Sequence, residues 1–92
     1  MIINAYFTNN SIPQSGLIPT IKIIRISDNS GIINTNMTEL QDGLYYYDFT
    51  TYENGEDYSI LCDGSATLQN EERYTYGSFG TDEVIKSDGF LV

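Results

Sequence analysis

The sequence predicts an all-β fold, a single small antiparallel β-sandwich, from its residue usage and the spacing of its turns. Residues that favour strands are abundant, with 12 isoleucines, 9 threonines and 8 tyrosines, whereas the helix formers alanine and lysine occur twice each. Eight glycines and eight asparagines recur at short intervals, which is typical of short strands joined by tight turns. A chain of 92 residues suffices for one domain, so residues 1–92 are expected to form a single sandwich.

Residues 2–7 form the first expected strand, because apolar residues dominate this segment. Asn9, Asn10 and Ser11 follow it and favour a turn. Pro13 cannot donate a backbone hydrogen bond to a central ladder. The first strand is therefore expected at the edge of a sheet.

Residues 20–26 form the second expected strand, in which the apolar alternation slips at Ile23 and Ile24. Either a β-bulge at this point or a strand buried on both faces explains the slip. A turn-forming run follows at residues 28–31, and residues 32–37 continue as a more polar strand. Residues 20–37 are therefore expected to form a β-hairpin.

Residues 45–51 show the most regular alternation in the chain. Tyr45, Tyr47 and Phe49 share one face, which is expected to point into the core. Residues 58–62 alternate in the same way after an Asn-Gly pair, which favours a two-residue hairpin turn. Such a hairpin would pair residues 49 with 60, 47 with 62 and 51 with 58.

An arch between two sheets is the alternative to this hairpin. In Ig-like sandwiches, a tyrosine near the start of a late strand hydrogen-bonds back across the corner between the sheets. Tyr58 has the position for that role. The periodicity fits both arrangements equally well, so the sequence leaves both open.

The last third of the chain carries weaker signals. Residues 64–73 are polar and have room for one helical turn, expected at residues 65–68, before residues 73–76 resume an extended pattern. Residues 78–92 form an acidic C-terminal extension that ends in the apolar run 90–92. This run is expected to pack against the chain itself or against a partner, because apolar side chains are unfavourable in water.

The charge excludes several classes of partner. Thirteen acidic against four basic residues give a net charge of −9, which repels nucleic-acid phosphates and anionic lipid headgroups. No apolar run approaches the length of a membrane span. We therefore expect neither nucleic acid nor a membrane as a partner.

The residue types available for catalysis are few. The chain has no histidine, and its single cysteine, Cys62, alternates with core-facing residues, so it is expected as a buried hydrophobic residue. Two carboxylates suffice for a glycosidase, but no spacing of acidic residues marks such a pair. A small carboxylate-dependent hydrolase is the weakest alternative, and the expectation is a non-enzymatic protein without catalytic residues.

Calcium is the one cofactor that the residues leave open, because carboxylate oxygens are in excess. The candidate ligands are Glu53, Asn54, Glu56, Asp57, Asp82 and Glu83. Neither cluster has the spacing of an EF-hand loop, and turn formation and solubility explain both. The expectation is therefore no cofactor and no metal site.

Tyrosines supply the candidate binding residues. Those of the core-facing alternation are buried in this scheme. The outward set, an exposed aromatic platform together with one aromatic residue of the C-terminal run, comprises Tyr46, Tyr52, Tyr74, Tyr76 and Phe90. Outward tyrosines suit a protein interface, and they also suit stacking against sugars, although the chain has no tryptophan. A protein interface is expected, with a carbohydrate-binding module for host glycans as the alternative.

Four motifs follow one another along the chain. They are SGLIPTIKI at residues 15–23, MTELQDGLYYYDF at 37–49, DYSILCDG at 57–64 and ERYTYG at 72–77. Their order resembles small Ig-like β-sandwich modules found in virion proteins of tailed bacteriophages. The resemblance covers residues 15–77 and leaves the acidic extension outside it.

This resemblance implies a structural or accessory role in a bacteriophage particle. Modules of this kind decorate capsids, form fibres, or act as adaptors at the neck, tail or baseplate, and they share no active-site residues. For this chain the resemblance implies an Ig-like fold, location in the virion, and contacts with other virion proteins and with itself as a homo-oligomer. Open sheet edges and a small core suit such assembly, because neighbours bury surface that the domain alone leaves exposed.

Overall fold

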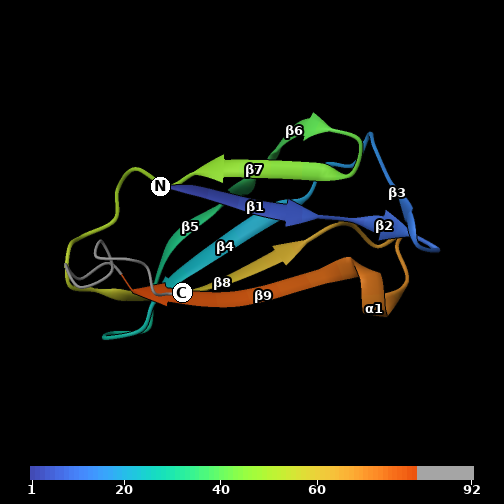
Figure 1. Ribbon diagram of the computed structural model, residues 1–92. Coiled ribbons are helices and arrows are strands. Elements are labelled where there is room, and N and C mark those ends of the chain that lie inside the picture. The colour runs from blue at the N-terminus through green and yellow to red at the C-terminus, as the bar shows by residue number, and fades with distance from the viewer. Residues whose placement is uncertain (81–92) are drawn as a thin grey trace.

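The computed structural model of the chain describes residues 1–80, which form two antiparallel sheets stacked as a sandwich (Figure 1). The three-stranded sheet has the order β1 (Ile2–Tyr6), β7 (Leu44–Asp48) and β6 (Thr38–Gln41). The four-stranded sheet has the order β5 (Ser30–Asn36), β4 (Thr20–Arg25), β8 (Asp57–Asp63) and β9 (Tyr74–Gly80). All strand pairs are antiparallel. The predicted all-β antiparallel sandwich is therefore confirmed.

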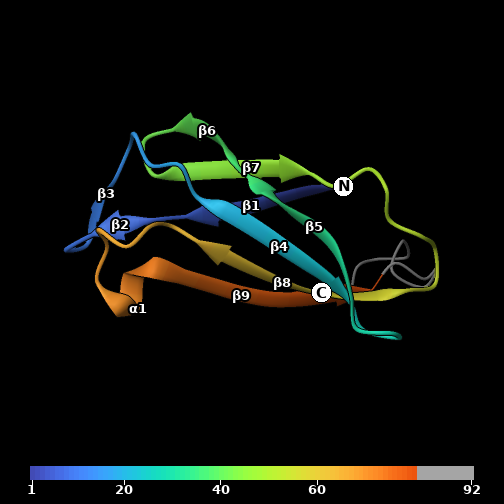
Figure 2. The same ribbon diagram turned by 180° about the vertical axis from the view of Figure 1, so that it is seen from behind.

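Two small elements close one end of the sandwich. β2 (Thr8–Asn9) and β3 (Ile12–Pro13) form a two-stranded hairpin, and α1 (Asn70–Arg73) is a single helical turn. Both lie at the same end of the molecule, as the front and back views show (Figure 2). A helical turn this short depends on tertiary contacts, because an isolated turn of helix is unstable in water.

The Glu72 carboxylate supplies those contacts by joining α1 to the turn between β2 and β3. It accepts a hydrogen bond from the Thr8 hydroxyl at 2.6 Å and from the backbone N–H groups of Asn10 and Ser11, each at 2.8 Å. Asn10 and Ser11 have φ angles of 55° and 67°, the left-handed conformation that a tight hairpin turn requires. The carboxylate thus holds a turn whose backbone is unfavourable for most residues other than glycine and asparagine.

The first strand is an edge strand, as predicted. Within residues 1–80, β7 is the one partner of β1. Ile3 and Ala5 are buried, whereas Ile2 and Tyr6 are exposed. The strand therefore follows the two-residue period of a sheet with one solvent-exposed face. Phe7 continues the inward set just past the strand end.

β4 and β5 form the predicted hairpin, and a β-bulge interrupts their pairing. The register shifts by one residue between Ile23 and Ile24, and the residue left without a partner is Ile32 in β5. β4 keeps its register with β8 across the same point. The bulge therefore lies in β5, opposite the slip in the apolar alternation, while Ile24 stays on the outer face of a regular strand.

The connection after β7 is an arch between the two sheets, and the hairpin considered for this segment is wrong. β7 pairs with β1 and β6, whereas β8 pairs with β4 and β9, so the expected pairing of residue 49 with 60 does not form. The backbone N–H of Glu53 donates a hydrogen bond to the Tyr58 hydroxyl at 2.9 Å across this corner. Tyr58 is 1% exposed, so its ring is anchored in the core while its hydroxyl holds the arch.

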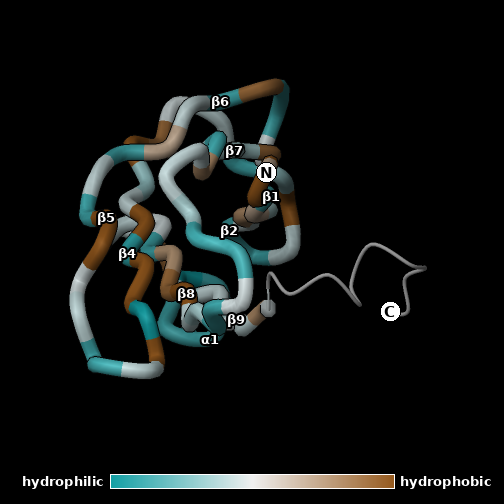
Figure 3. Tube along the Cα trace, turned by 90° about the vertical axis from the view of Figure 1, so that its left-hand side faces the viewer, coloured by the Kyte–Doolittle hydropathy of each residue, from teal (hydrophilic) through white to brown (hydrophobic). Residues whose placement is uncertain are grey.

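The core-facing residues of β7, continued by Phe49, contact those of β8 across the core between the two sheets. They do not lie side by side within one sheet. The rings of Phe49 and Tyr58 lie 5.1 Å apart and perpendicular, and Phe79 of β9 contacts both. Seen along the strands, the two sheets form two layers (Figure 3). The buried core between them consists of Ile3, Ala5, Phe7, Ile21, Ile23, Met37, Tyr45, Phe49, Tyr58, Cys62 and Leu68.

The helical turn lies later in the chain than predicted. Residues 65–68 form a turn closed by a hydrogen bond from the Leu68 N–H to the Ser65 carbonyl at 3.2 Å, and the helix is α1. Leu68 is buried beside Phe7 and Gly64, so core packing, rather than helix propensity, determines the path of this segment. Residues 1–80 contain no helix that is long and apolar enough to cross a membrane.

The predicted extended run at residues 73–76 is the beginning of β9. This strand continues to Gly80 and so includes the first residues of the segment expected as a C-terminal extension. Residues 81–92, with the apolar run 90–92, lie outside the described residues.

Candidate binding surfaces

Alternate residues of β1 and β7 form the outer face of the three-stranded sheet, which we name the three-strand face. Ile2 and Tyr6 of β1 are 57% and 55% exposed. Leu44 and Tyr46 of β7 are half-buried, and Leu44 lies directly opposite Tyr6. Tyr46, a predicted binding residue, lies in the middle strand of this sheet, opposite Asn4.

The three-strand face carries little charge in a strongly acidic chain. Among the outward residues of β1 and β7, Asp48 alone has a charged side chain, and it lies opposite Ile2 at the end of the face. The N-terminal ammonium of Met1 donates a hydrogen bond to the Asp48 carboxylate at 3.2 Å, which offsets that charge. A neutral apolar face is where a second acidic chain approaches with least repulsion.

Apolar surface continues from the three-strand face toward the turn between β2 and β3. Tyr6 packs over Gly43 next to Pro13, since a Cβ added at Gly43 would lie 3.0 Å from atoms of both side chains. Ile12, which precedes Pro13, is 66% exposed, and Leu40 in the bulge of β6 is 57% exposed. Elements adjoining the three-strand face therefore add to its exposed apolar area.

The outer face of β9 carries a stacked pair of tyrosines. The ring centroids of Tyr74 and Tyr76 lie 6.1 Å apart, and Tyr76 is 73% exposed. The Arg73 guanidinium lies 4.8 Å from the centre of the Tyr74 ring and donates two hydrogen bonds to the Asp63 carboxylate, at 2.7 and 3.0 Å. These hydrogen bonds hold the pKa of Asp63 below its usual value. The two tyrosines thus offer aromatic surface beside the ion pair between Arg73 and Asp63.

The predicted tyrosines do not gather on one platform. Tyr46 lies on the three-strand face, whereas Tyr74 and Tyr76 lie on the outer face of the opposite sheet. Tyr52 lies in the arch, 38% exposed, with its ring against the aromatic core. Phe90 lies outside the described residues.

Tyr6 is an exposed tyrosine that the predicted outward set omitted. The sequence contains a signal for it, because residues 3, 5 and 7 form the apolar alternation of the first strand. Residue 6 therefore falls on the opposite face of that strand.

Cys62 belongs to the core, in agreement with its prediction as a buried hydrophobic residue. Its side chain is 2% exposed. Burial raises the pKa of the thiol to about 11, so the thiol is protonated at neutral pH.

The first acidic cluster considered for calcium lies in the arch beside Arg25. The Arg25 guanidinium donates a hydrogen bond to Glu53 at 2.9 Å and a bidentate pair to Asp28 at 2.9 and 3.1 Å. These bonds hold the pKa of Asp28 well below its usual value. A cation of the chain itself thus engages part of the acidic region, and the second cluster, residues 82–83, lies outside the described residues.

No protein-family model, curated protein or solved structure matches this chain. A function is therefore inferred from the chemistry of its surfaces. Of the surfaces described, the three-strand face combines exposed apolar side chains with an almost complete lack of charge.

Proposed function

We propose that this chain is a non-enzymatic structural protein that acts through protein–protein contacts and associates with further copies of itself. The three-strand face carries the proposal, because Ile2 and Tyr6 are more than half exposed there. Exposed apolar area is unfavourable in water by about 25 cal/mol per Å², and a partner removes that area from water. A domain this small gains more from such contacts than a large one, since its own core buries a smaller fraction of its surface.

The charge of the chain favours this face for self-association. Copies that each carry −9 repel one another wherever acidic surfaces meet. A two-fold axis would place the three-strand faces of two copies together and keep the acidic loops apart. Tyr6 and Tyr46 are of a residue type that is enriched at protein interfaces.

The strand order supports an Ig-like arrangement. With β1 as strand B, β4 and β5 as C and C′, β6 and β7 as D and E, and β8 and β9 as F and G, the two sheets have the orders B-E-D and C′-C-F-G. An equivalent of strand A is not present within residues 1–80. Tyr58, at the start of β8, has the place and the hydrogen bond of a tyrosine corner.

The proposed setting is the virion of a tailed bacteriophage, in the capsid, neck or tail, with other virion proteins as partners. The resemblance of residues 15–77 supports this setting. The motifs that carry it lie on the strands of the sandwich: residues 57–64 contain β8, for example, and residues 37–49 contain β6 and β7.

Light scattering after size exclusion tests the proposed self-association. The wild-type chain is expected as a defined oligomer. Tyr6→Lys places a charge on the three-strand face and is expected to give a monomer with an unchanged circular dichroism spectrum. Tyr76→Lys makes the same change on an exposed tyrosine of the opposite sheet and is expected to remain an oligomer.

Two results contradict the proposal. One is a wild-type chain that stays monomeric at every concentration. The other is an oligomer that Tyr76→Lys dissociates and Tyr6→Lys does not. Repeating the measurement with calcium and then with a chelator shows whether the oligomer depends on this ion.

Carbohydrate binding is the second candidate, and the stacked pair Tyr74 and Tyr76 favours it. Exposed aromatic rings offer flat apolar surface for a sugar ring, and Asp63 and Arg73 lie beside them. Retention on a panel of immobilised host-surface glycans tests it. A variant with both tyrosines replaced by alanine should lose retention and keep its mass in solution, and a wild-type chain that no glycan retains contradicts this candidate.

A further inference from the structure

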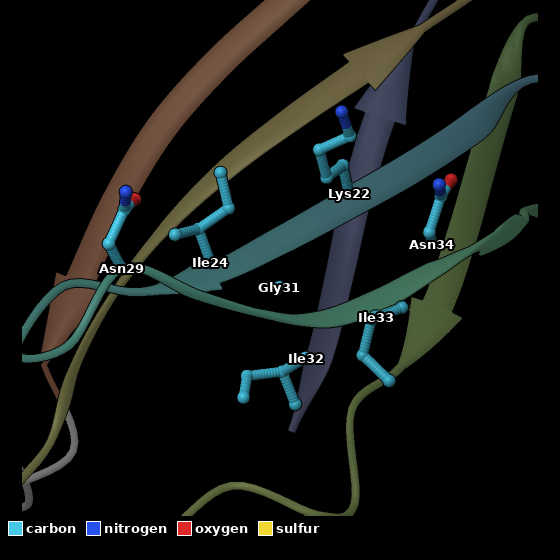
Figure 4. A pocket seen from close by; sticks show the side chains of 7 residues that line it. All are labelled: Lys22, Ile24, Asn29, Gly31, Ile32, Ile33 and Asn34. Atoms are coloured by element: carbon cyan, nitrogen blue, oxygen red, sulfur yellow. The ribbon is translucent and has the colours of Figure 1, made fainter.

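A hollow of about 400 Å³ lies on the outer face of the four-stranded sheet, over the edge strand β5 (Figure 4). The β-bulge creates it, because Ile32 is the extra residue of the bulge and both Ile32 and Ile33 pack against the core. Gly31, just before them, has no side chain, and a Cβ added there would meet nothing within 4 Å. The outer face of β5 is therefore bare backbone from residue 31 to residue 33.

The walls of the hollow combine one apolar side chain with polar ones. Lys22 and Ile24 of β4 flank the bare stretch, and Asn29 and Asn34 stand at its two ends, all on the same side of the sheet (Figure 4). Lys22 and Ile24 are two residues apart, so they share one face of β4 about 6.6 Å from each other. Of the acidic side chains in residues 1–80, none lines the hollow.

Lys22 is the one basic side chain of residues 1–80 without an ion pair. The other two, Arg25 and Arg73, both bind carboxylates of the chain itself. The N–H donors of the Lys22 ammonium are therefore available to a carboxylate of another molecule.

β5 is an outermost strand of its sheet, so one side of its backbone has no strand partner within the described residues. Its sequence, SGIINTN, contains none of the charged residues with which edge strands commonly prevent pairing. An extended peptide can add to such an edge through backbone hydrogen bonds. Its outward side chains would pass over Gly31 to reach Ile24, and beside Asn34, the cross-strand neighbour of Lys22, to reach the Lys22 ammonium.

We propose that this hollow binds an extended acidic segment of a partner protein, added as a strand along β5. A carboxylate of the segment meets the Lys22 ammonium, and an apolar side chain two residues away covers Gly31 and packs against Ile24. The two-residue spacing matches the strand period that separates Lys22 from Ile24. The site lies on the sheet opposite the three-strand face, so it does not depend on the self-association proposed above.

The sign of the charge makes this proposal sharply testable. A chain with a net charge of −9 attracts cationic peptides non-specifically and repels acidic ones. Preference for an acidic peptide therefore requires a local cationic site.

The test is an NMR titration of the full-length, ¹⁵N-labelled protein at about 0.15 M salt, where long-range charge effects are screened. The probe is the nonapeptide Glu-Thr-Val-Thr-Glu-Thr-Val-Thr-Glu, whose acidic and valine side chains share one face. Two control peptides carry glutamine or lysine in place of glutamate. The acidic peptide should shift the backbone amides of residues 31–34 and bind about threefold tighter than the glutamine peptide, the ratio typical of one exposed ion pair.

Four variants separate the parts of the site. Lys22→Gln should remove the preference for the acidic over the glutamine peptide, whereas Lys22→Arg should keep it. Gly31→Leu fills the hollow and should weaken binding by about tenfold or more, because the added side chain occupies the place of the ligand. Ser78→Leu adds the same side chain to β9, the opposite edge strand of this sheet and outside the hollow, and should leave the affinity unchanged.

Several results would overturn the proposal. One is that the lysine peptide binds as tightly as the acidic peptide or more tightly, and another is that the acidic peptide does not bind at millimolar concentration. The others are that the acidic peptide shifts amides outside β4 and β5 instead of those of residues 31–34, and that Gly31→Leu binds it with unchanged affinity. The spectrum of each variant also reports its fold, and if Gly31→Leu loses its native spectrum, the comparison of Lys22→Gln with Lys22→Arg decides the question.

Discussion

Replacing Tyr45 by phenylalanine removes a single hydroxyl group from the core and keeps the ring. Tyr45 is fully buried, and its hydroxyl donates a hydrogen bond to the Gln14 carbonyl at 2.9 Å and accepts one from the Leu17 N–H at 3.1 Å. These two bonds hold the loop that leads from β3 to β4, which belong to different sheets. We expect Tyr45→Phe to destabilise the fold, because both backbone groups lose their partner.

The size of the effect follows from the number of bonds. Each intramolecular hydrogen bond contributes about 1 kcal/mol net, and a partly buried backbone group left without a partner costs about 1–3 kcal/mol. The free energy of unfolding should therefore fall by about 2–3 kcal/mol. For a domain of this size, that loss corresponds to a fall in Tm of roughly 10–20 °C.

Urea unfolding of Tyr45→Phe measures this loss, with Tyr47→Phe as the matched control. Tyr47 is half-buried against the same core, and its hydroxyl forms no hydrogen bond within residues 1–80. The control should stay within about 0.5 kcal/mol of the wild type. A Tyr45→Phe variant as stable as this control would refute the reasoning.

The pH dependence gives a second test of the same residue. Burial raises the pKa of Tyr45 above its usual value of 10.0. The stabilisation linked to its neutral hydroxyl is therefore complete below about pH 10 and is lost as the pH rises through the higher pKa of the folded state. Tyr45→Phe lacks this loss, so the stability difference between wild type and variant should narrow above about pH 10.

Three further predictions concern Glu72, Gly64 and Cys62. Hydrogen bonds, led by that from the Thr8 hydroxyl, lower the pKa of Glu72 below 4.5, so its stabilisation is present above that pH and is lost as the pH falls through the folded-state value. Glu72→Gln should therefore lose less stability than the wild type on acidification. Urea unfolding at several pH values measures this, and an equal fall in the free energy of unfolding of both proteins would contradict it. A Cβ at Gly64 would lie 2.6 Å from the Leu68 side chain, so Gly64→Ala should lower the free energy of unfolding by about 1–3 kcal/mol, and unchanged stability would disprove the close packing. Because Cys62 is 2% exposed, a thiol reagent should label the native protein far more slowly than the urea-unfolded chain, and equal rates would place it at the surface.

Local patterns in the sequence predicted which side chains are buried. The alternation around Tyr45, Tyr58 and Cys62 places each of them on the core face, and all three are buried. The edge position of residues 2–7 is also confirmed, and a turn joins β4 to β5 as predicted, although it covers residues 26–29 and residues 30–31 belong to β5. Each of these features depends on residues that are close together in the chain.

The binding surfaces were less accessible to prediction, since they depend on which strands become neighbours. The alternation identifies Tyr46, Tyr74 and Tyr76 as outward residues, but their assignment to opposite sheets follows from strand pairing. The hollow over Gly31 exists because the bulge turns two consecutive isoleucines inward, and no local pattern shows which strand contains the bulge.

The sequence by itself determined the all-β class, the buried faces of the strands and the acidic surface. Only the tertiary structure decided that an arch follows β7, that the bulge lies in β5 and that Glu72 fastens a turn some sixty residues earlier in the chain. The reason is that a two-residue period is the same whether two strands pair within one sheet or face each other across the core. Contacts between residues distant in the chain, such as Phe49 with Phe79, distinguish the two arrangements.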